Sequence, residues 1–248
     1  MPRDVTATNG HRSRRSLIVT VLIVFVATPV TLALGTIYDS GSYYATSVLV
    51  VIYALVPFFV SFEQAKPSAH TVVIVAVLCA LAVVARAAFF WIPYVTAITA
   101  VIIIAGIGMG AQAGFMVGAL SLFVSNFLFA QGPWTPWQMF SYGLTGFVFG
   151  LLAQKDVIPR SRLTRRQKVI LAVTSFLFVL CITGPILDTS SVFMMLSTVT
   201  PEGALAVYAT GLPVNAIHGL STAVILYLLA NPLLDQLARI RTKYGLAA

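Results

Sequence analysis

The run Gln131-Gly132-Pro133-Trp134-Thr135-Pro136-Trp137-Gln138-Met139 lies between two long apolar segments and holds two of the three tryptophans. Its second half predicts a helix start, with Thr135 as the N-cap, Pro136 in the first helical position and Gln138 where a capping box places its acceptor side chain. Gly132 and Thr135 each precede a proline, which disfavours the α region for both residues. The run therefore indicates a stiff corner between two helices.

The composition around this corner is that of a membrane protein. Hydrophobic residues make up 59% of the chain and charged residues 9%, which is far from the balance of a soluble domain. Several apolar runs approach or exceed the roughly 18 residues of a transmembrane helix. We expect an all-α fold, a polytopic helical bundle in the plasma membrane. The eight expected spans are Ser16–Thr36, Tyr44–Phe62, His70–Ala88, Thr96–Met109, Ala111–Ala130, Pro136–Ala153, Lys168–Ile186 and Leu212–Ala230.

The charged residues determine the orientation of these spans. If the N-terminus is inside, every lysine and arginine except Arg86 falls in a cytoplasmic loop or tail, and the opposite loops carry Asp39, Asp188 and Glu202. Basic residues accumulate on the cytoplasmic side of membrane proteins, so both termini are expected in the cytoplasm. The net charge of +8 thus reflects topology and does not indicate nucleic-acid binding. No small-residue cleavage site follows the basic N-terminus, so no removable signal peptide is expected.

This topology divides the chain into four parts. A basic cytoplasmic tail at 1–15 precedes an N-terminal transmembrane hairpin at 16–62. A six-helix core follows at 70–230, and an amphipathic basic tail at 231–248 is expected to lie on the cytoplasmic membrane surface.

Glycines recur at four-residue intervals in the core, from Gly106 to Gly118 and again at Gly146 and Gly150. Small residues at this spacing let transmembrane helices approach closely. The span Thr96–Met109 is short and lies beside these glycines, so a partial or kinked crossing is expected there.

Polar and aromatic side chains gather at the outer ends of the spans. The tryptophans all fall outside, whereas a lipid-anchoring belt, which is the alternative, normally populates both faces. Arg86 could anchor its helix end or serve as a cation for a substrate carboxylate or phosphate. Such a convergence of groups is typical of a ligand pocket. The candidate substrate-binding residues are Arg86, Trp91, Asn126, Gln131, Trp134, Trp137, Gln138, Asn215 and His218.

No set of residues in the sequence indicates catalysis or a bound cofactor. There is no phosphate-binding loop and no nucleophile elbow, and no cluster with metal-ligand spacing accompanies His218. All seven acidic residues lie in loops or at span ends, which disfavours ion-coupled transport without removing it. We therefore expect a binding protein that needs neither cofactor nor metal and, if it transports, takes its energy from a partner.

Several runs of the core resemble the substrate-specific S components of energy-coupling factor (ECF) vitamin transporters. The similarity covers about residues 70–248 and six spans, the number usual in that family. The runs that carry it are Arg86-Ala87-Ala88-Phe89, Gly106 through Gly118, Val124-Ser125-Asn126-Phe127, Gln131 through Met139, Pro232-Leu233-Leu234 and Lys243-Tyr244-Gly245-Leu246.

The resemblance implies a subunit that binds a vitamin from outside and works with a transmembrane coupling protein and a pair of ATPase subunits. It also implies a partner interface of small residues in the first core helix, here Ala76 and Ala80. A cobalamin-type vitamin is favoured, with riboflavin, folate, pantothenate and queuosine precursors open. The N-terminal hairpin departs from the six-helix pattern. Two other functions stay open: a secondary transporter that works alone, and a lipid-modifying membrane enzyme that uses Arg86 and His218.

Overall fold

The computed structural model describes residues 43–196 and 198–245, and it is helical without a strand in those residues. This confirms the expected all-α fold. The expected tail at 1–15 and first span, Ser16–Thr36, lie outside the described residues. The described helices are α3 (Tyr43–Gln64), α4 (Ala69–Ala88), α5 (Ile98–Met109), α6 (Ala111–Phe129), α7 (Thr135–Gln154), α8 (Arg165–Phe178), the π-helical turn η2 (Val179–Thr183), α9 (Gly184–Met195) and α10 (Pro201–Tyr244).

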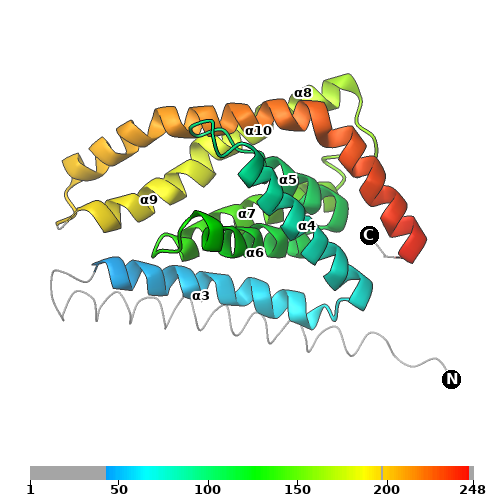
Figure 1. Ribbon diagram of the computed structural model, residues 1–248, viewed down its shortest axis with the longest axis horizontal. Coiled ribbons are helices and arrows are strands. Elements are labelled where there is room, and N and C mark those ends of the chain that lie inside the picture. Colours follow the sequence, from blue (N-terminus) through cyan, green and yellow to red (C-terminus); the bar gives the residue numbers. More distant parts are fainter. Residues whose placement is uncertain (1–42, 197, 246–248) are drawn as a thin grey trace.

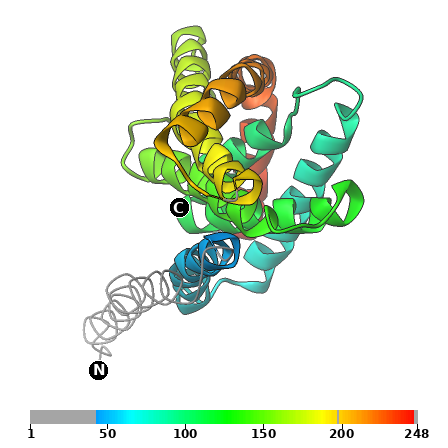
Figure 2. The ribbon, with the colours of Figure 1, turned by 90° about the vertical axis from the view of Figure 1, so that its left-hand side faces the viewer.

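Five helical stretches of the described chain are long and apolar enough to cross a membrane. They are α3, α4, α6, the continuous stretch α8–η2–α9 and α10. The centre of the bundle is formed by α5, α6 and α7, with α3 along one side and α10 along the other (Figure 1). In the view turned by 90°, α4 and α8 lie on opposite sides of the bundle (Figure 2). The fourth expected span forms a short apolar helix, because α5 has 12 residues.

The glycine series allows α5, α6 and α7 to pack backbone against backbone. A Cβ atom added at Gly106 would overlap the carbonyl oxygen of Gly146, and one added at Gly146 would overlap that of Gly114. Between α5 and α6 the chain turns at Gly110, whose φ of 93° suits a residue without a side chain. As a result, residues Ile98 to Gly108 of α5 are all buried.

The C-terminal tail continues the last helix. The helix α10 runs from Pro201 to Tyr244 without a break, so the tail at 231–248 is, as far as it is described, a continuation of the last span. Leu234 and Leu237 are buried in the core, and Arg241 Nη1 donates a hydrogen bond to the Gly108 carbonyl at 3.1 Å. Those contacts attach the tail to the inner end of α5. The bend in α10 (Figure 1) falls in its second half, which contains Pro232.

The corner between α6 and α7 also differs in detail. Thr135 is the first residue of α7 and Trp134 precedes it without a side-chain cap, so the expected capping box does not form. The Thr135 hydroxyl instead donates to Gln131 Oε1 at 2.9 Å and accepts from Asn126 Nδ2 at 3.0 Å. The Thr135 side chain thus accepts a hydrogen bond from Asn126 of α6 instead of from an N–H group in the first turn of α7.

Candidate substrate-binding site

A cavity of about 350 Å³ lies at the outer end of the bundle, among α4, α7, α9, α10 and the loop that follows α4. This volume is at the lower end of the roughly 300–1,000 Å³ that small-molecule pockets occupy. The rim residues Phe90, Ile92 and Tyr94 are exposed, so the cavity opens to the surface. Its lining residues are Arg86, Phe89, Phe90, Ile92, Tyr94, Val95, Thr96, Ile98, Tyr142, Leu187, Asp188, Ser191, Val214, Asn215 and His218.

Arg86 enters the cavity wall from the last turn of α4. Its Nη1 atom donates to Ser125 Oγ at 2.6 Å and to Asn126 Oδ1 at 2.9 Å. The guanidinium carbon lies 4.8 Å from the centre of the Phe129 ring, a cation–π geometry. Three residues of α6 therefore hold this guanidinium beside the cavity.

The wall formed by α9 and α10 carries a carboxylate. Asn215 Nδ2 donates a hydrogen bond to Asp188 Oδ2 at 2.7 Å. A Cβ atom added at Gly184 would overlap the Asn215 amide, and one added at Gly211 would overlap the Asp188 carboxylate. The two glycines thus provide the space in which this pair fits.

Tyr142 and His218 form an aromatic wall of the same cavity. Their ring centroids lie 5.9 Å apart with an interplanar angle of 30°, and both side chains are buried. His218 Nε2 is hydrogen-bonded to Thr99 Oγ1 at 2.7 Å. The loop that closes the cavity is attached to α10, because the backbone N–H of Thr96 donates to Ser221 Oγ at 3.4 Å.

The structure separates the sequence-predicted residues into three groups. Arg86, Asn215 and His218 line the cavity. The second group lies outside the cavity lining and holds Arg86. Asn126 accepts a hydrogen bond from Arg86, and Gln131 and Gln138 belong with Asn126 and Thr135 to one hydrogen-bonded cluster. The tryptophans do not line the cavity: Trp91 is 86% exposed, the Trp134 ring packs over Gly132, and Trp137 lies 6.1 Å from Phe193.

Sequence reasoning missed two cavity residues, Asp188 and Tyr142. The expected span ends at Ile186 and so leaves Asp188 in an outer loop, whereas α9 continues to Met195. Tyr142 lies seven residues beyond the start of α7, in a stretch rich in glycine and hydroxyl residues. The sequence signal that could have identified Tyr142 is its position among the small residues of α7, which leave room beside an aromatic ring with a hydroxyl group.

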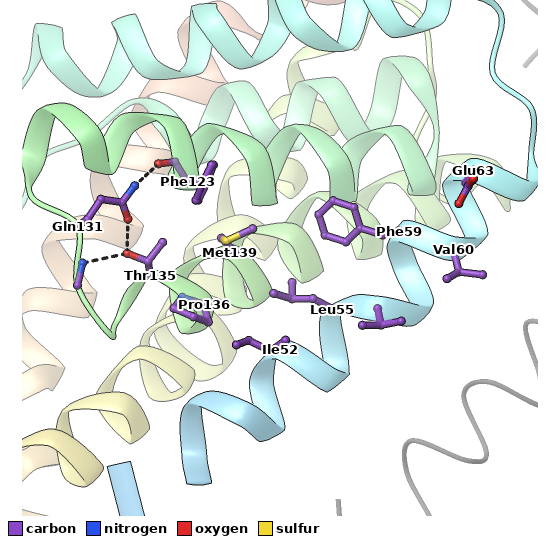
Figure 3. A pocket seen from close by; sticks show the side chains of 12 residues that line it. Ile52, Leu55, Phe59, Val60, Glu63, Phe123, Gln131, Thr135, Pro136 and Met139 are labelled. Carbon is purple, nitrogen blue, oxygen red and sulfur yellow. Dashed lines mark hydrogen bonds between the residues drawn. The ribbon is translucent and has the colours of Figure 1, made fainter. Parts of the chain in front are cut away.

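Figure 3 shows a second, larger cavity of about 580 Å³ between α3 and the corner of α6 and α7. Its lining is mostly apolar, with Phe59 on α3 and Phe123 on α6. The polar groups at its outer end are already engaged, since Gln131 donates to the Phe123 carbonyl at 2.9 Å and accepts from Thr135. We therefore place the candidate site in the smaller, more polar cavity.

The candidate interface residues lie on α4 further from the cavity than Arg86, near the middle of the helix. Ala76 and Ala80 are exposed, together with Val73 and Val77 on the same helix. At the inner end of this face, an apolar groove of about 460 Å³ separates α4 from the end of α10. The exposed face of α4 thus extends from the cytoplasmic end towards the middle of the bundle.

Among residues 43–196 and 198–245 there is no group of three or more His, Cys, Asp or Glu side chains that could hold a metal ion. In a comparison with known protein families, the family described as "ECF-type riboflavin transporter, S component" matches residues 66–235. No curated protein and no solved structure shows significant similarity to the chain. The matched residues include every residue that lines the outer cavity.

Proposed function

The chain belongs to the family of S components of ECF-type riboflavin transporters, and from this membership we propose that it binds riboflavin, or a flavin close to it, in the outer cavity. S components are vitamin-binding membrane subunits of transporters, and the family is not one of enzymes. The protein is accordingly a multi-pass protein of the plasma membrane, in keeping with its five long apolar helical stretches. The family is named for riboflavin, not for the cobalamin type that the sequence resemblance favoured.

The observation that carries the proposal is the combination of an aromatic wall with polar groups at both ends of one cavity. The isoalloxazine ring of a flavin is flat and can stack on Tyr142 and His218, as aromatic pairs do. Its ring nitrogens, carbonyls and ribityl hydroxyls supply donors and acceptors for Arg86, Asp188 and Asn215. A corrinoid is far too large for a cavity of about 350 Å³.

The direct test is to identify small molecules that copurify with the detergent-solubilised protein by mass spectrometry, and to titrate the emptied protein with riboflavin. We expect quenching of flavin fluorescence and tight, saturable binding. His218→Ala should weaken binding, whereas Trp91→Ala should not, because Trp91 is exposed and does not line the cavity. A different copurifying vitamin, with no flavin binding, would refute the proposal.

We further propose that uptake depends on partners. S components work with an ECF transmembrane coupling protein and ATPase subunits, and the exposed small residues Ala76 and Ala80 supply a surface where another helix can pack closely. Flavin uptake should therefore require the coupling protein and the ATPases in the same cell. Uptake at the full rate without them would favour the stand-alone secondary transporter.

A further inference from the structure

We infer that the inner end of α7, the loop that follows it and the start of α8 form a binding site for an anionic phospholipid of the cytoplasmic leaflet. An acyl chain lies in an apolar groove of this site, and the headgroup phosphate lies between Lys155 and Arg166. The site is at the basic end of the bundle, which the sequence assigns to the cytoplasm, whereas the candidate flavin cavity is at the outer end. The inference therefore does not depend on the proposed function.

The groove has a volume of about 120 Å³ and lies between the end of α7, the loop that follows it and one face of α8. Its α8 wall extends from Gln167 to Thr174, which is roughly 10 Å along the helix axis. In the middle of that wall Ile170 is 51% exposed, and Val157 on the loop is 65% exposed. The groove thus leads from the level of the basic residues into the apolar part of α8, the range of depth in which a phospholipid passes from headgroup to acyl chain.

The protein around this groove is strongly basic. Residues 155–168 include six lysines and arginines and one acid, the exposed Asp156. Three of the basic side chains contact a backbone carbonyl, a carboxylate or an aromatic ring of the described chain: Arg160, Arg162 and Lys168. The other three, Lys155, Arg165 and Arg166, are exposed and make no such contact within residues 43–196 and 198–245. This surface therefore has an excess of positive charge that its own side chains do not neutralise.

Lys155 and Arg166 flank the inner mouth of the groove. Lys155, the C-cap of α7, follows the lining residue Leu152 by three positions, and Arg166 precedes the lining residue Ile170 by four. Residues at these spacings are neighbours on one face of a helix. Arg166 also lies in the first turn of α8, which contains no acid, so the positive end of the helix dipole adds to its charge. A phosphate at this mouth meets positive charge from both walls of the groove.

The position of the groove in the bundle favours a lipid over a partner helix. The candidate docking face, with Ala76 and Ala80, is on α4, and α4 and α8 lie on opposite sides of the bundle (Figure 2). A partner on α4 therefore leaves α8 in contact with the bilayer. Beside the groove α8 exposes Val169 and Val173, as a helix in lipid does. Basic residues at the cytoplasmic end of such a helix attract anionic headgroups.

The test measures the binding of phosphatidylglycerol and phosphatidylcholine with identical acyl chains to the purified full-length protein by native mass spectrometry. We expect saturable binding of phosphatidylglycerol, several-fold tighter than that of phosphatidylcholine. The double variant Lys155→Gln/Arg166→Gln should raise the Kd of phosphatidylglycerol by on the order of ten- to thirtyfold, the effect of two basic residues beside an anionic headgroup. The Kd of phosphatidylcholine should change little. Ile170→Trp, which narrows the groove without changing the charge, should weaken the binding of both lipids.

Lys66→Gln/Lys243→Gln is the matched control, because it removes the same charge from two exposed residues that do not line the groove. It should bind phosphatidylglycerol like the wild type. Equal losses in the two double variants overturn the inference, since net charge alone would then attract the lipid. Unchanged binding by Ile170→Trp overturns it as well, because the groove would hold no acyl chain.

Two further outcomes also contradict the inference. A wild-type protein without preference for phosphatidylglycerol overturns it, whether or not the variants fold. If Lys155→Gln/Arg166→Gln bound the lipid like the wild type but no longer copurified with the ATPase subunits, the basic surface would belong to an acidic protein partner. The melting temperature of each variant without added lipid, measured on the same preparation, shows that the variant is folded.

Discussion

Phe58 of α3 lies face to face with Phe115 of α6, with ring centroids 3.9 Å apart and ring planes 4° apart. The edge of the Phe147 ring meets Phe58 from α7, at a centroid distance of 5.1 Å. The family match begins at residue 66, so this aromatic cluster attaches a helix outside the match to the family core. Between transmembrane helices, such packing replaces the hydrophobic effect as the source of association.

We expect Phe58→Ala to lower the thermal stability of the purified protein, by about 1–2 kcal/mol, because it removes aromatic packing that lipid replaces only in part. Flavin affinity should stay unchanged, since α3 contributes no residue to the outer cavity. Leu49→Ala is the matched control on α3, because Leu49 is 42% exposed. If Phe58→Ala weakened flavin binding, α3 would have to be counted as part of the binding unit.

Gly146→Ala should destabilise the protein much more than the addition of one methyl group usually does. The added methyl group would overlap the Gly114 carbonyl oxygen, and backbone cannot move aside as a flexible side chain can. We expect a loss of about 1–3 kcal/mol or more, as for overpacked cores, measured as a lower melting temperature and reduced yield. Gly203→Ala is the control, because its methyl group would meet only the ends of the Leu196 and Thr200 side chains. Equal tolerance of both changes would contradict close packing at Gly146.

The helical pattern of the core could be predicted because hydropathy, basic loops and glycine spacing are local signals. They gave the short helix α5 and the close packing that Gly106 and Gly146 allow. Arg86, Asn215 and His218 were predicted as binding residues for a similar reason, since their depth in the membrane follows from their place in a span. The depth of a residue in the membrane, however, does not determine which side chains face one another.

The sequence was less informative where the outcome depends on the exact end of a helix or on which side chains form hydrogen bonds with each other. The π-helical turn Val179–Thr183 widens the helix before α9, and hydropathy falls before that helix ends, so Asp188 was placed in a loop. At the α6–α7 corner, a polar side chain could be predicted near the surface, but not that Asn126 and Thr135 would bond to each other. In the tail at 231–248, basic residues dominate the sequence pattern, which does not reveal that Leu234 and Leu237 are buried in the core.

Thr99→Val should weaken flavin binding although Thr99 itself does not line the cavity. It removes the hydroxyl that bonds to His218 Nε2 at 2.7 Å while nearly keeping the side-chain volume. An unpaired buried nitrogen costs about 1–3 kcal/mol, so the imidazole ring should reorient and melting temperature should fall as well. Thr99→Ser, which keeps the hydroxyl, should restore the affinity. If Val and Ser behaved alike, His218 would be held by packing alone.

Trp137→Ala tests whether this tryptophan contacts the ligand, as its position in the sequence suggests. In the structure its ring lies 6.1 Å from that of Phe193, which joins α7 to α9. We therefore expect a lower melting temperature and a nearly unchanged flavin affinity, with both measured on one preparation. If Trp137→Ala lowered the flavin affinity as much as Thr99→Val, we would conclude that Trp137 contacts the ligand.

The last prediction concerns the face of α4 that carries Ala76 and Ala80. Both residues are exposed, so a bulky residue at either position meets no side chain of the described bundle. A partner helix that packs on small residues would be excluded by steric overlap, because its backbone could no longer approach. Ala80→Trp should therefore leave flavin binding by the isolated protein intact, and abolish copurification with the coupling protein and ATP-dependent uptake.

Ala206→Trp provides the matched control, since Ala206 is an exposed alanine on the outer half of α10 and lies far along the chain from this face. That variant should bind flavin, copurify with the coupling protein and support uptake like the wild type. Loss of flavin binding in Ala80→Trp would mean that Ala80 contacts its own chain. Normal uptake by Ala80→Trp would move the docking surface away from α4, and α3, which lies outside the family match, would be the next helix to test.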